Sequence, residues 1–137
     1  MNPPFTVDAS VFVSAFSPAE IAHVKSKSFM REVRESNTPI IVPTIVIPEI
    51  SAAIGRGQGK PDLAIAFAKE VTQFPNLTLI SVDEALAQFA AETAARHRLR
   101  GSDAIYAAVS LRFGTNLITL DREQLERLKK VLSVHSP

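Results

Sequence analysis

The sequence predicts an α/β fold: a three-layer α/β/α sandwich around a mostly parallel sheet of about five strands. Short β-branched or apolar runs alternate along the chain with segments of helical periodicity. The chain has 137 residues, of which 46% are hydrophobic, so we expect one domain, residues 1–137, with an ordinary core. No internal repeat or low-complexity tract interrupts the alternation.

Composition narrows the classes of function. The net charge of +1 is too small to predict nucleic-acid binding from the field of the whole molecule. There is no cysteine, which excludes disulfides and thiolate zinc sites and allows a reducing cytoplasm. We see no signal peptide and no apolar stretch of about 18 residues, so we expect a cytoplasmic protein with no membrane partner.

The first strand is predicted at residues 5–7, and it stops at Asp8. Residues 9–12 are interpreted as the turn that leaves the strand. Asp8 is thereby placed at the carboxyl end of a buried strand, where open α/β sheets bind their ligands.

A helix is predicted to begin at Ser17, which can cap it, with Pro18 in the first position and Glu20 completing a capping box. It should fade at residues 36–39, and residues 40–42 form the next buried strand. Pro48 argues against a strand in the following apolar segment, so we expect a helix that begins near residues 44–46.

A glycine-rich loop is expected at residues 55–61. Its spacing does not fit a phosphate-binding P-loop, because Gly55 and Gly59 enclose three residues instead of four and Pro61 stands where Ser or Thr is needed. We therefore interpret it as a surface linker.

The remaining elements follow the same alternation. A buried, nearly all-apolar helix should begin at Ser102, and the helix before it should end at residues 96–101 with cations and a glycine. The predicted helices lie at 62–74, 84–100, 102–113 and 122–130, and the predicted strands at 77–80, 116–120 and, as an edge, 131–134.

The five aspartates divide by position. Asp62 and Asp83 are explained as a first-turn acid and a helix cap. Asp8 and Asp121 each end a hydrophobic strand, and in a parallel sheet such ends meet at one edge, where two carboxylates can share a cation. Asp121 also fits a helix cap with Gln124 in the third position, and the spacing alone leaves both interpretations open.

Two further acids stand in apolar surroundings. Asp103 begins the apolar helix and can be a cap or can sit at the rim of a buried face. Glu49 is flanked by Pro48 and Ile50, and a buried carboxylate needs a partner cation or a metal.

Together these residues resemble the four acidic motifs of the PIN domain, and their order and spacing are similar to VapC-type toxins. The matching segments are Val7-Asp8-Ala9-Ser10, Ile47-Pro48-Glu49-Ile50, Ser102-Asp103-Ala104-Ile105 and Thr119-Leu120-Asp121. The resemblance implies a compact α/β/α domain with Mg²⁺- or Mn²⁺-dependent ribonuclease activity on RNA. It also implies a homodimer and an inhibitory antitoxin protein. The glycine-rich segment at 55–60 is longer than that pattern leads us to expect.

Oxygen-only ligands favour Mg²⁺ or Mn²⁺ over zinc. We assign Asp8 and Asp103 as the chief metal ligands and Asp121 and Glu49 as supporting catalytic acids. Such an ion holds a phosphodiester oxygen and activates the attacking water. Ser10 and Thr119 are candidates for orienting water or phosphate, or for purely local hydrogen bonds.

Arg96, Arg98 and Arg100 are candidates for RNA contacts, or for a solvated helix end. His97 falls on the apolar face and is interpreted as a core histidine.

Two other functions remain open. One is a catalytically weak or inactive module of the same fold that binds RNA or protein. The other is a phosphatase with Asp8 as nucleophile, which is disfavoured because Ser10 stands where a second aspartate is expected.

Overall fold

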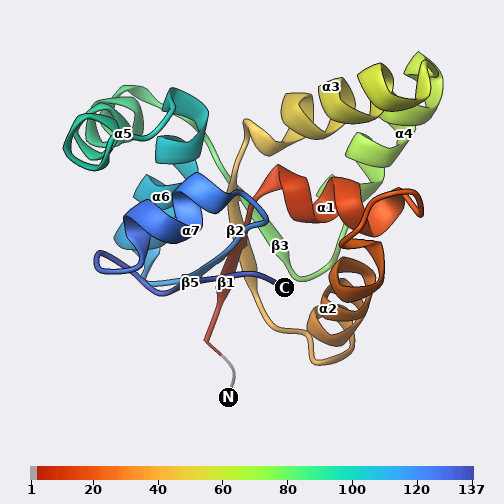
Figure 1. Ribbon diagram of the computed structural model, residues 1–137, viewed down its shortest axis with the longest axis horizontal. Helices are drawn as coiled ribbons and strands as arrows, with labels where there is room; N and C mark the ends of the chain where they lie inside the picture. The colour runs from red at the N-terminus through yellow and green to blue at the C-terminus, as the bar shows by residue number, and fades with distance from the viewer. Residues whose placement is uncertain (1–2) are drawn as a thin grey trace.

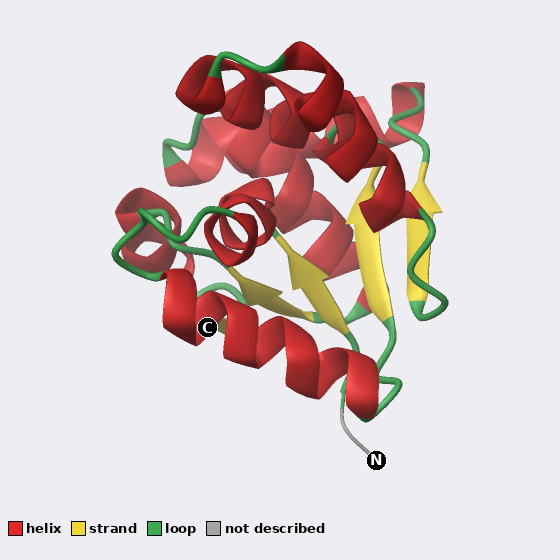
Figure 2. Cartoon of the chain, turned by 90° about the vertical axis from the view of Figure 1, so that its right-hand side faces the viewer, coloured by secondary structure: helices red, strands yellow, loops and turns green. Residues whose placement is uncertain are grey.

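The computed structural model describes residues 3–137, and within them a five-stranded sheet has the order β3-β2-β1-β4-β5. Every pair of neighbouring strands is parallel, so the predicted class is confirmed and the sheet is wholly parallel. Figure 2 shows the strands between helices on both faces. The strands are β1 (Phe5–Val7), β2 (Ile40–Pro43), β3 (Leu77–Ile80), β4 (Asn116–Ile118) and β5 (Val134–His135).

The helices form two layers. In Figure 1, the helices between β1 and β3 lie to the right of the sheet, and those after β3 lie to the left. The first group is α1 (Ala9–Phe16), α2 (His23–Glu35), α3 (Val46–Gln58) and α4 (Pro61–Thr72), and the second is α5 (Glu84–His97), α6 (Gly101–Phe113) and α7 (Arg122–Leu128). None of the helices in residues 3–137 has the length and apolarity needed to cross a bilayer.

The strand order reverses at β1. The chain moves from β1 outward to β2 and β3, then crosses to the other side of β1 to form β4 and β5. Thr6 pairs with Leu117 and Val7 with Ile118, so β1 and β4 end together. A crevice beyond the carboxyl ends of two such strands is the usual place for a ligand in an open α/β sheet.

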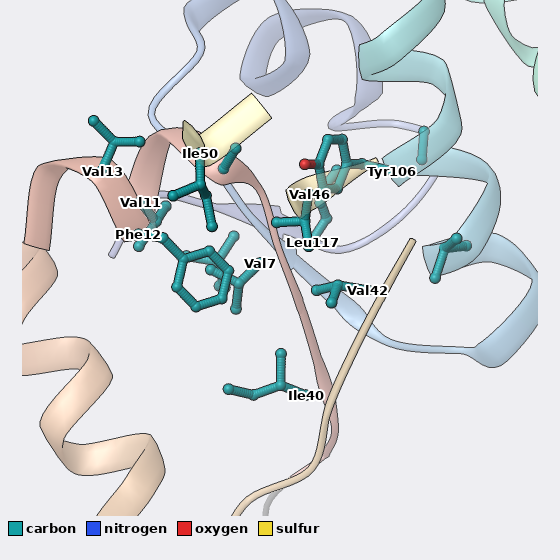
Figure 3. Close-up of a cluster of buried hydrophobic side chains, with 14 of the residues drawn as sticks. Val7, Val11, Phe12, Val13, Ile40, Val42, Val46, Ile50, Tyr106 and Leu117 are labelled. Atoms are coloured by element: carbon teal, nitrogen blue, oxygen red, sulfur yellow. The ribbon is translucent and has the colours of Figure 1, made fainter. Parts of the chain in front are cut away.

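The core lies between the central strands and the helices that cover them. Figure 3 shows Val7, Val42 and Leu117 of the strands in one cluster with Phe12 of α1 and Ile50 of α3. On the other face, α6 is buried along most of its length, as its apolar sequence predicts. Its small alanines allow the helix to lie close to β1, β2 and β4. The core thus fixes α6, and with it Asp103, against the middle of the sheet.

The prediction of a turn at residues 9–12 was wrong, because α1 begins directly after Asp8. The helix buries Ala9, Val11 and Phe12 against the core, and this packing outweighs the weak helix propensity of its β-branched residues. Asp8 stands at the N-cap position, but its side chain does not cap the helix.

The predicted capping box at Ser17 is also absent. Residues 18–22 form turns in which the amide of Glu20 donates to Ser17 and the amide of His23 donates to Glu20. Helix α2 begins only at His23. Ile21 is left fully exposed in this segment, which packs too little apolar surface to extend the helix.

The expected loop at 55–61 is much shorter. Helix α3 continues through Gly55 and Gly57 to Gln58, and Gly59 ends it with a left-handed φ of 63°. A Cβ on Gly55 would contact the Cβ of Ala64 at 3.9 Å, so α3 and α4 pack closely there. That packing offsets the roughly 1 kcal/mol by which each internal glycine disfavours a helix.

Three element ends differ from the prediction. Arg98, with a φ of 55°, takes the left-handed position after α5, and Gly101 is the first residue of α6. Strand β4 stops at Ile118 because Thr119 and Leu120 bend toward the site. The edge strand lies at Val134–His135, and the residues before it form a turn.

Candidate active site

All four predicted acids line one open hollow at the carboxyl edge of the sheet. Asp8 follows β1, Glu49 lies in the first turn of α3, Asp103 in the first turn of α6, and Asp121 precedes α7. Each comes from a different part of the chain. The sheet topology therefore brings the predicted set together.

Asp8 is held by two hydroxyl groups. Ser10 Oγ donates to Asp8 Oδ2 at 2.6 Å, and Thr119 Oγ1 donates to the same oxygen at 3.0 Å. Each hydroxyl in turn accepts a backbone amide, from Leu120 at 3.2 Å and from Asp121 at 3.0 Å. Both of these side-chain donors act on Oδ2, and within residues 3–137 no side chain donates to Oδ1.

Burial raises the pKa of Asp8, which is only 7% exposed. The hydrogen bonds from Ser10 and Thr119 act in the opposite direction, and the charge of Glu49 raises the pKa further. A buried carboxylate in this environment is stabilised when a nearby cation neutralises its charge.

Arg100 bridges two acids. Its Nε donates to Asp103 Oδ2 at 3.1 Å, and its Nη2 donates to Asp121 Oδ2 at 2.6 Å. The side chain of Arg100 is 67% exposed, whereas those of Asp103 and Asp121 are 10% and 21% exposed. The guanidinium thus covers the two carboxylates from the solvent side.

Gln124 ties the same two acids from the interior. Its backbone amide donates to Asp121 Oδ1 at 3.1 Å, and its side-chain Nε2 donates to Asp103 Oδ1 at 3.1 Å. Asp121 is therefore both the cap of α7 and part of the site, one role for each oxygen. Gln124 is fully buried, and its Oε1 has no hydrogen-bond partner in the described residues.

The pKa of Asp103 is also raised, first by burial and then by the charge of Asp121. The hydrogen bond and charge of Arg100 lower it, and the charge of Asp8 raises it. The hollow is therefore a set of mutually repelling carboxylates, and among residues 3–137 only Asp103 and Asp121 of this set form ion pairs with a cation.

Glu49 has a partner that the sequence did not suggest. Tyr106 of α6 donates its hydroxyl to Glu49 Oε1 at 2.6 Å, although 57 residues separate them. Tyr106 is fully buried, and this burial, followed by the charges of Asp8 and Glu49, raises its pKa. A neutral hydrogen-bond donor thus serves where a cation or metal was expected.

The donor set is composed of carboxylate oxygens, which suits a hard divalent cation. Within residues 3–137, however, no three acidic, histidine or cysteine side chains are gathered closely enough to hold an ion. The guanidinium of Arg100 explains part of this separation, because it binds one oxygen of Asp103 and one oxygen of Asp121. The residues fit a divalent ion by chemistry, and they are arranged here around a guanidinium.

The three arginines predicted to contact RNA lie in two different hollows. Arg100 lies in the acidic hollow, while Arg96 and Arg98 line a different one at the ends of α5 and α7. His97 was interpreted as a core residue, but it is only half-buried and lines that second hollow. The helix end lies at the surface, so the apolar face of α5 does not extend to it.

Sequence reasoning missed the structural roles of Gln124 and Tyr106. The sequence pattern of Gln124 indicates only a place in a capping box, and Tyr106 is the single tyrosine of the chain. The available signal for Tyr106 was a hydroxyl inside the nearly apolar helix α6, since a buried hydroxyl needs a partner; the polar sequence of α7 gives no such signal for Gln124.

The fold and the hollow define the class: a doubly wound parallel α/β domain with an acidic site at its topological switch point. The sequence matches the PIN domain family over residues 5–131, and the chain belongs to that family. The PIN domain family is a family of nucleases, so the chain is a member of a nuclease family.

Solved structures of similar fold include proteins described as a toxin and as a toxin–antitoxin complex. VapC20 of Mycobacterium tuberculosis, described as a sarcin-ricin loop cleaving toxin, has 20% identity and a TM-score of 0.77, and the match covers 98% of this chain and 99% of that one. VapBC2 of Rickettsia felis bound to promoter DNA has 12% identity and a TM-score of 0.72, covering 98% of each chain. A toxin–antitoxin complex of Klebsiella pneumoniae has 15% identity and a TM-score of 0.68, covering 99% and 98%. No curated protein matches the sequence.

Proposed function

We propose that this protein is a divalent-metal-dependent endoribonuclease, a single nuclease domain that acts as the toxin of a VapBC-type pair in the cytoplasm. The observation that carries the proposal is the meeting of Asp8, Glu49, Asp103 and Asp121 in one hollow at the carboxyl ends of β1 and β4. Membership of the PIN family and the toxin neighbours support it.

Mg²⁺ or Mn²⁺ would be held by Asp8 and Asp103, with Asp121 and Glu49 assisting. When bound, the ion supplies Lewis-acid chemistry that stabilises the charge developing on a phosphodiester. The hydroxyls of Ser10 and Thr119 orient the carboxylate of Asp8 through Oδ2. Gln124 sets the angle between Asp103 and Asp121 from the interior.

The decisive experiment is RNA cleavage by purified protein with Mg²⁺ or Mn²⁺ and with EDTA. Asp8→Asn and Asp103→Asn should each abolish cleavage while the far-ultraviolet circular dichroism stays unchanged. Asp62→Asn is the matched control, because Asp62 is an exposed first-turn acid of α4 outside the hollow. Undiminished cleavage by either site variant, or in excess EDTA, would refute the proposal.

A second candidate function has one observation in its favour. Arg100 already contacts Asp103 and Asp121, as expected of an inactive module whose acids are neutralised internally. Calorimetric titration with Mn²⁺ separates the two functions. Binding that Asp8→Asn removes supports the nuclease, and no binding to the wild type supports the inactive module.

The proposal includes an antitoxin partner, in line with the VapBC and toxin–antitoxin complexes among the structural neighbours, and it also includes a homodimer. A hollow lined by Phe12, Phe16, Phe67 and Phe74 of α1, α4 and the segment after α4 offers apolar surface to a protein. Ile21, which lies between two lining residues in sequence, is fully exposed.

Untagged protein purified from its source organism should carry a second polypeptide that the substitution Ile21→Asp weakens. The mass of the purified chain in light scattering tests the homodimer. A single monomeric species in both measurements would contradict this part of the proposal.

A further inference from the structure

A second hollow, on the same side of the sheet as α6, is strongly basic. The ends of α5 and α7 form it together with the residues just beyond them. We call it the basic hollow, and its charged lining residues are Arg96, Arg98, Arg127, Lys129, Lys130 and a single acid, Glu126.

The charge of the basic hollow exceeds what local structure explains. Five cations and one acid give it a net charge of +4, while the whole chain carries only +1, so the rest of the molecule is at −3. Two helix C-termini together present roughly −1 elementary charge. The helix dipoles therefore offset about a quarter of the surplus, and most of it is available to a ligand.

Backbone contacts keep the basic hollow in shape. Arg127 of α7 donates through Nη1 to the carbonyl oxygen of Arg98, and its Nη2 lies 3.5 Å from Glu123. Arg127 thus connects the end of α7 to the end of α5. The other four cations are exposed, and in residues 3–137 none of them pairs with an acid.

The basic hollow and the acidic one are lined by nearby residues of one chain segment. Arg98 lines the first and Arg100 lines the second. Their Cα atoms are two residues apart, so they can be separated by no more than about 7 Å. In Figure 1, α5, whose end lines the basic hollow, lies next to α6, which carries Asp103 of the acidic hollow.

The lining also selects the kind of ligand. All of the described residues that line the basic hollow are charged residues or histidine, and none is apolar. A docking protein segment gains affinity by burying apolar anchors, for which this surface has no counterpart. A polyanion that binds through its charges alone does fit, and the phosphate backbone of nucleic acid is such a ligand.

We infer that the basic hollow is a phosphate-binding exosite that holds the RNA backbone a few nucleotides from the scissile bond. This inference depends on the proposed nuclease function for its choice of RNA. Arg96, Arg98, Lys129 and Lys130 contact phosphates, and Arg127 positions them. Binding there is independent of base sequence and of the divalent ion.

The test is fluorescence anisotropy with a labelled 20-nucleotide single-stranded RNA in EDTA, where cleavage does not interfere. The variants are Arg96→Gln/Arg98→Gln and Lys129→Gln/Lys130→Gln. The matched control is Lys25→Gln/Lys27→Gln on α2, which removes the same charge from two exposed lysines across the sheet. Each exosite pair should weaken binding about tenfold and lower the slope of log K against log salt by about 1.4. The control pair should change neither.

Cleavage kinetics give a second readout. On a long RNA, the exosite variants should raise KM and leave kcat unchanged, because the lost contacts are made equally before and during the reaction. On a trinucleotide too short to reach the exosite, they should match the wild type.

The outcomes separate this inference from the proposed function. Unchanged RNA affinity in both exosite pairs overturns the exosite even if the wild type cleaves RNA. Lost affinity supports it even if the wild type cleaves nothing, which would overturn only the nuclease proposal. Tighter binding of a polyglutamate peptide of equal charge than of the RNA overturns the assignment to nucleic acid.

Discussion

The hydroxyl of Tyr106 donates to Oε1 of Glu49 at 2.6 Å and joins α6 to α3 across the carboxyl edge of the sheet. Tyr106 is fully buried, whereas Glu49 is half-buried and lines the acidic hollow. One of the site's acids is thus oriented by a residue whose ring belongs to the core. The stability of α6 and the geometry of the site are therefore linked.

This link predicts a measurable coupling energy. Tyr106→Phe should reduce the free energy of unfolding by about 1–2 kcal/mol, because Glu49 loses a donor but remains partly open to water. A double-mutant cycle with Glu49→Gln, measured by urea denaturation, should give a coupling of about 1 kcal/mol. Strict additivity of the two substitutions would show that the hydrogen bond contributes nothing.

Asp8 predicts a specific pH dependence of stability without metal. Since burial raises its pKa in the folded state, the folded protein holds the proton to higher pH than the unfolded chain. The stabilising contribution of Asp8 to the free energy of unfolding is therefore fully present below about pH 4, the pKa of an aspartate in the unfolded chain. It is lost as the pH rises through the pKa of Asp8 in the folded protein.

Asp8→Asn should flatten this part of the profile and be at least as stable as the wild type at neutral pH. Thermal unfolding in EDTA between pH 4 and pH 8 measures it. Asp62→Asn, whose carboxylate is exposed, is the control and should leave the profile parallel to that of the wild type. A profile of Asp8→Asn parallel to the wild type would contradict the prediction.

Thr119 predicts a large effect from a nearly isosteric substitution. Thr119→Val removes the donor to Asp8 Oδ2 and the acceptor for the amide of Asp121 at a fully buried position. We expect a loss of about 2–3 kcal/mol in chemical denaturation, because an amide and a carboxylate both lose a partner.

The same substitution at Thr78, exposed on β3, is the control and should stay within about 0.5 kcal/mol of the wild type. Equal effects at the two positions would show that the hydrogen bonds of Thr119 do not stabilise the site.

The position of Arg100 leads us to expect that its guanidinium competes with a divalent ion for the carboxylates of the site. Its guanidinium holds Oδ2 of both Asp103 and Asp121, oxygens that a divalent ion would need. Arg100→Gln should tighten Mn²⁺ binding about three- to tenfold in calorimetry, since a positive charge and a competing donor are removed.

Arg112→Gln, at the far end of α6 and stacked near Phe89, serves as the matched control and should leave Mn²⁺ affinity unchanged. Weaker Mn²⁺ binding by Arg100→Gln would show that the arginine organises the acids for the ion instead of competing with it.

The placement of the acids could be predicted from sequence because it depends on strand order and strand ends. Asp8 and Asp121 follow apolar runs, and parallel pairing places such ends on one edge. The sequence left two interpretations of Asp121 open, a helix cap and a site residue, and the structure shows that they are compatible. A carboxylate has two oxygens, and Asp121 accepts from the α7 amide with one and from Arg100 with the other.

The partners of the acids could not be predicted, because they depend on how helices rotate against one another. Gln124 contacts Asp103 across 21 residues, and Tyr106 contacts Glu49 across 57. Local propensity also missed α1, where a turn was predicted, and misplaced the start of α2; tertiary packing of Phe12 and the exposure of Ile21 decided the outcome.

The segment that follows β4 supplies Thr119, Asp121 and Gln124, and β4 reaches its place beside β1 only after more than a hundred residues have been made. A chain in which this segment is not yet made therefore holds Asp8 without its distant donor Thr119 and lacks Asp121 of the acidic cluster. Assembly of the hollow must await synthesis of β4 and the start of α7, so a product terminated before residue 119 would be released without a formed site.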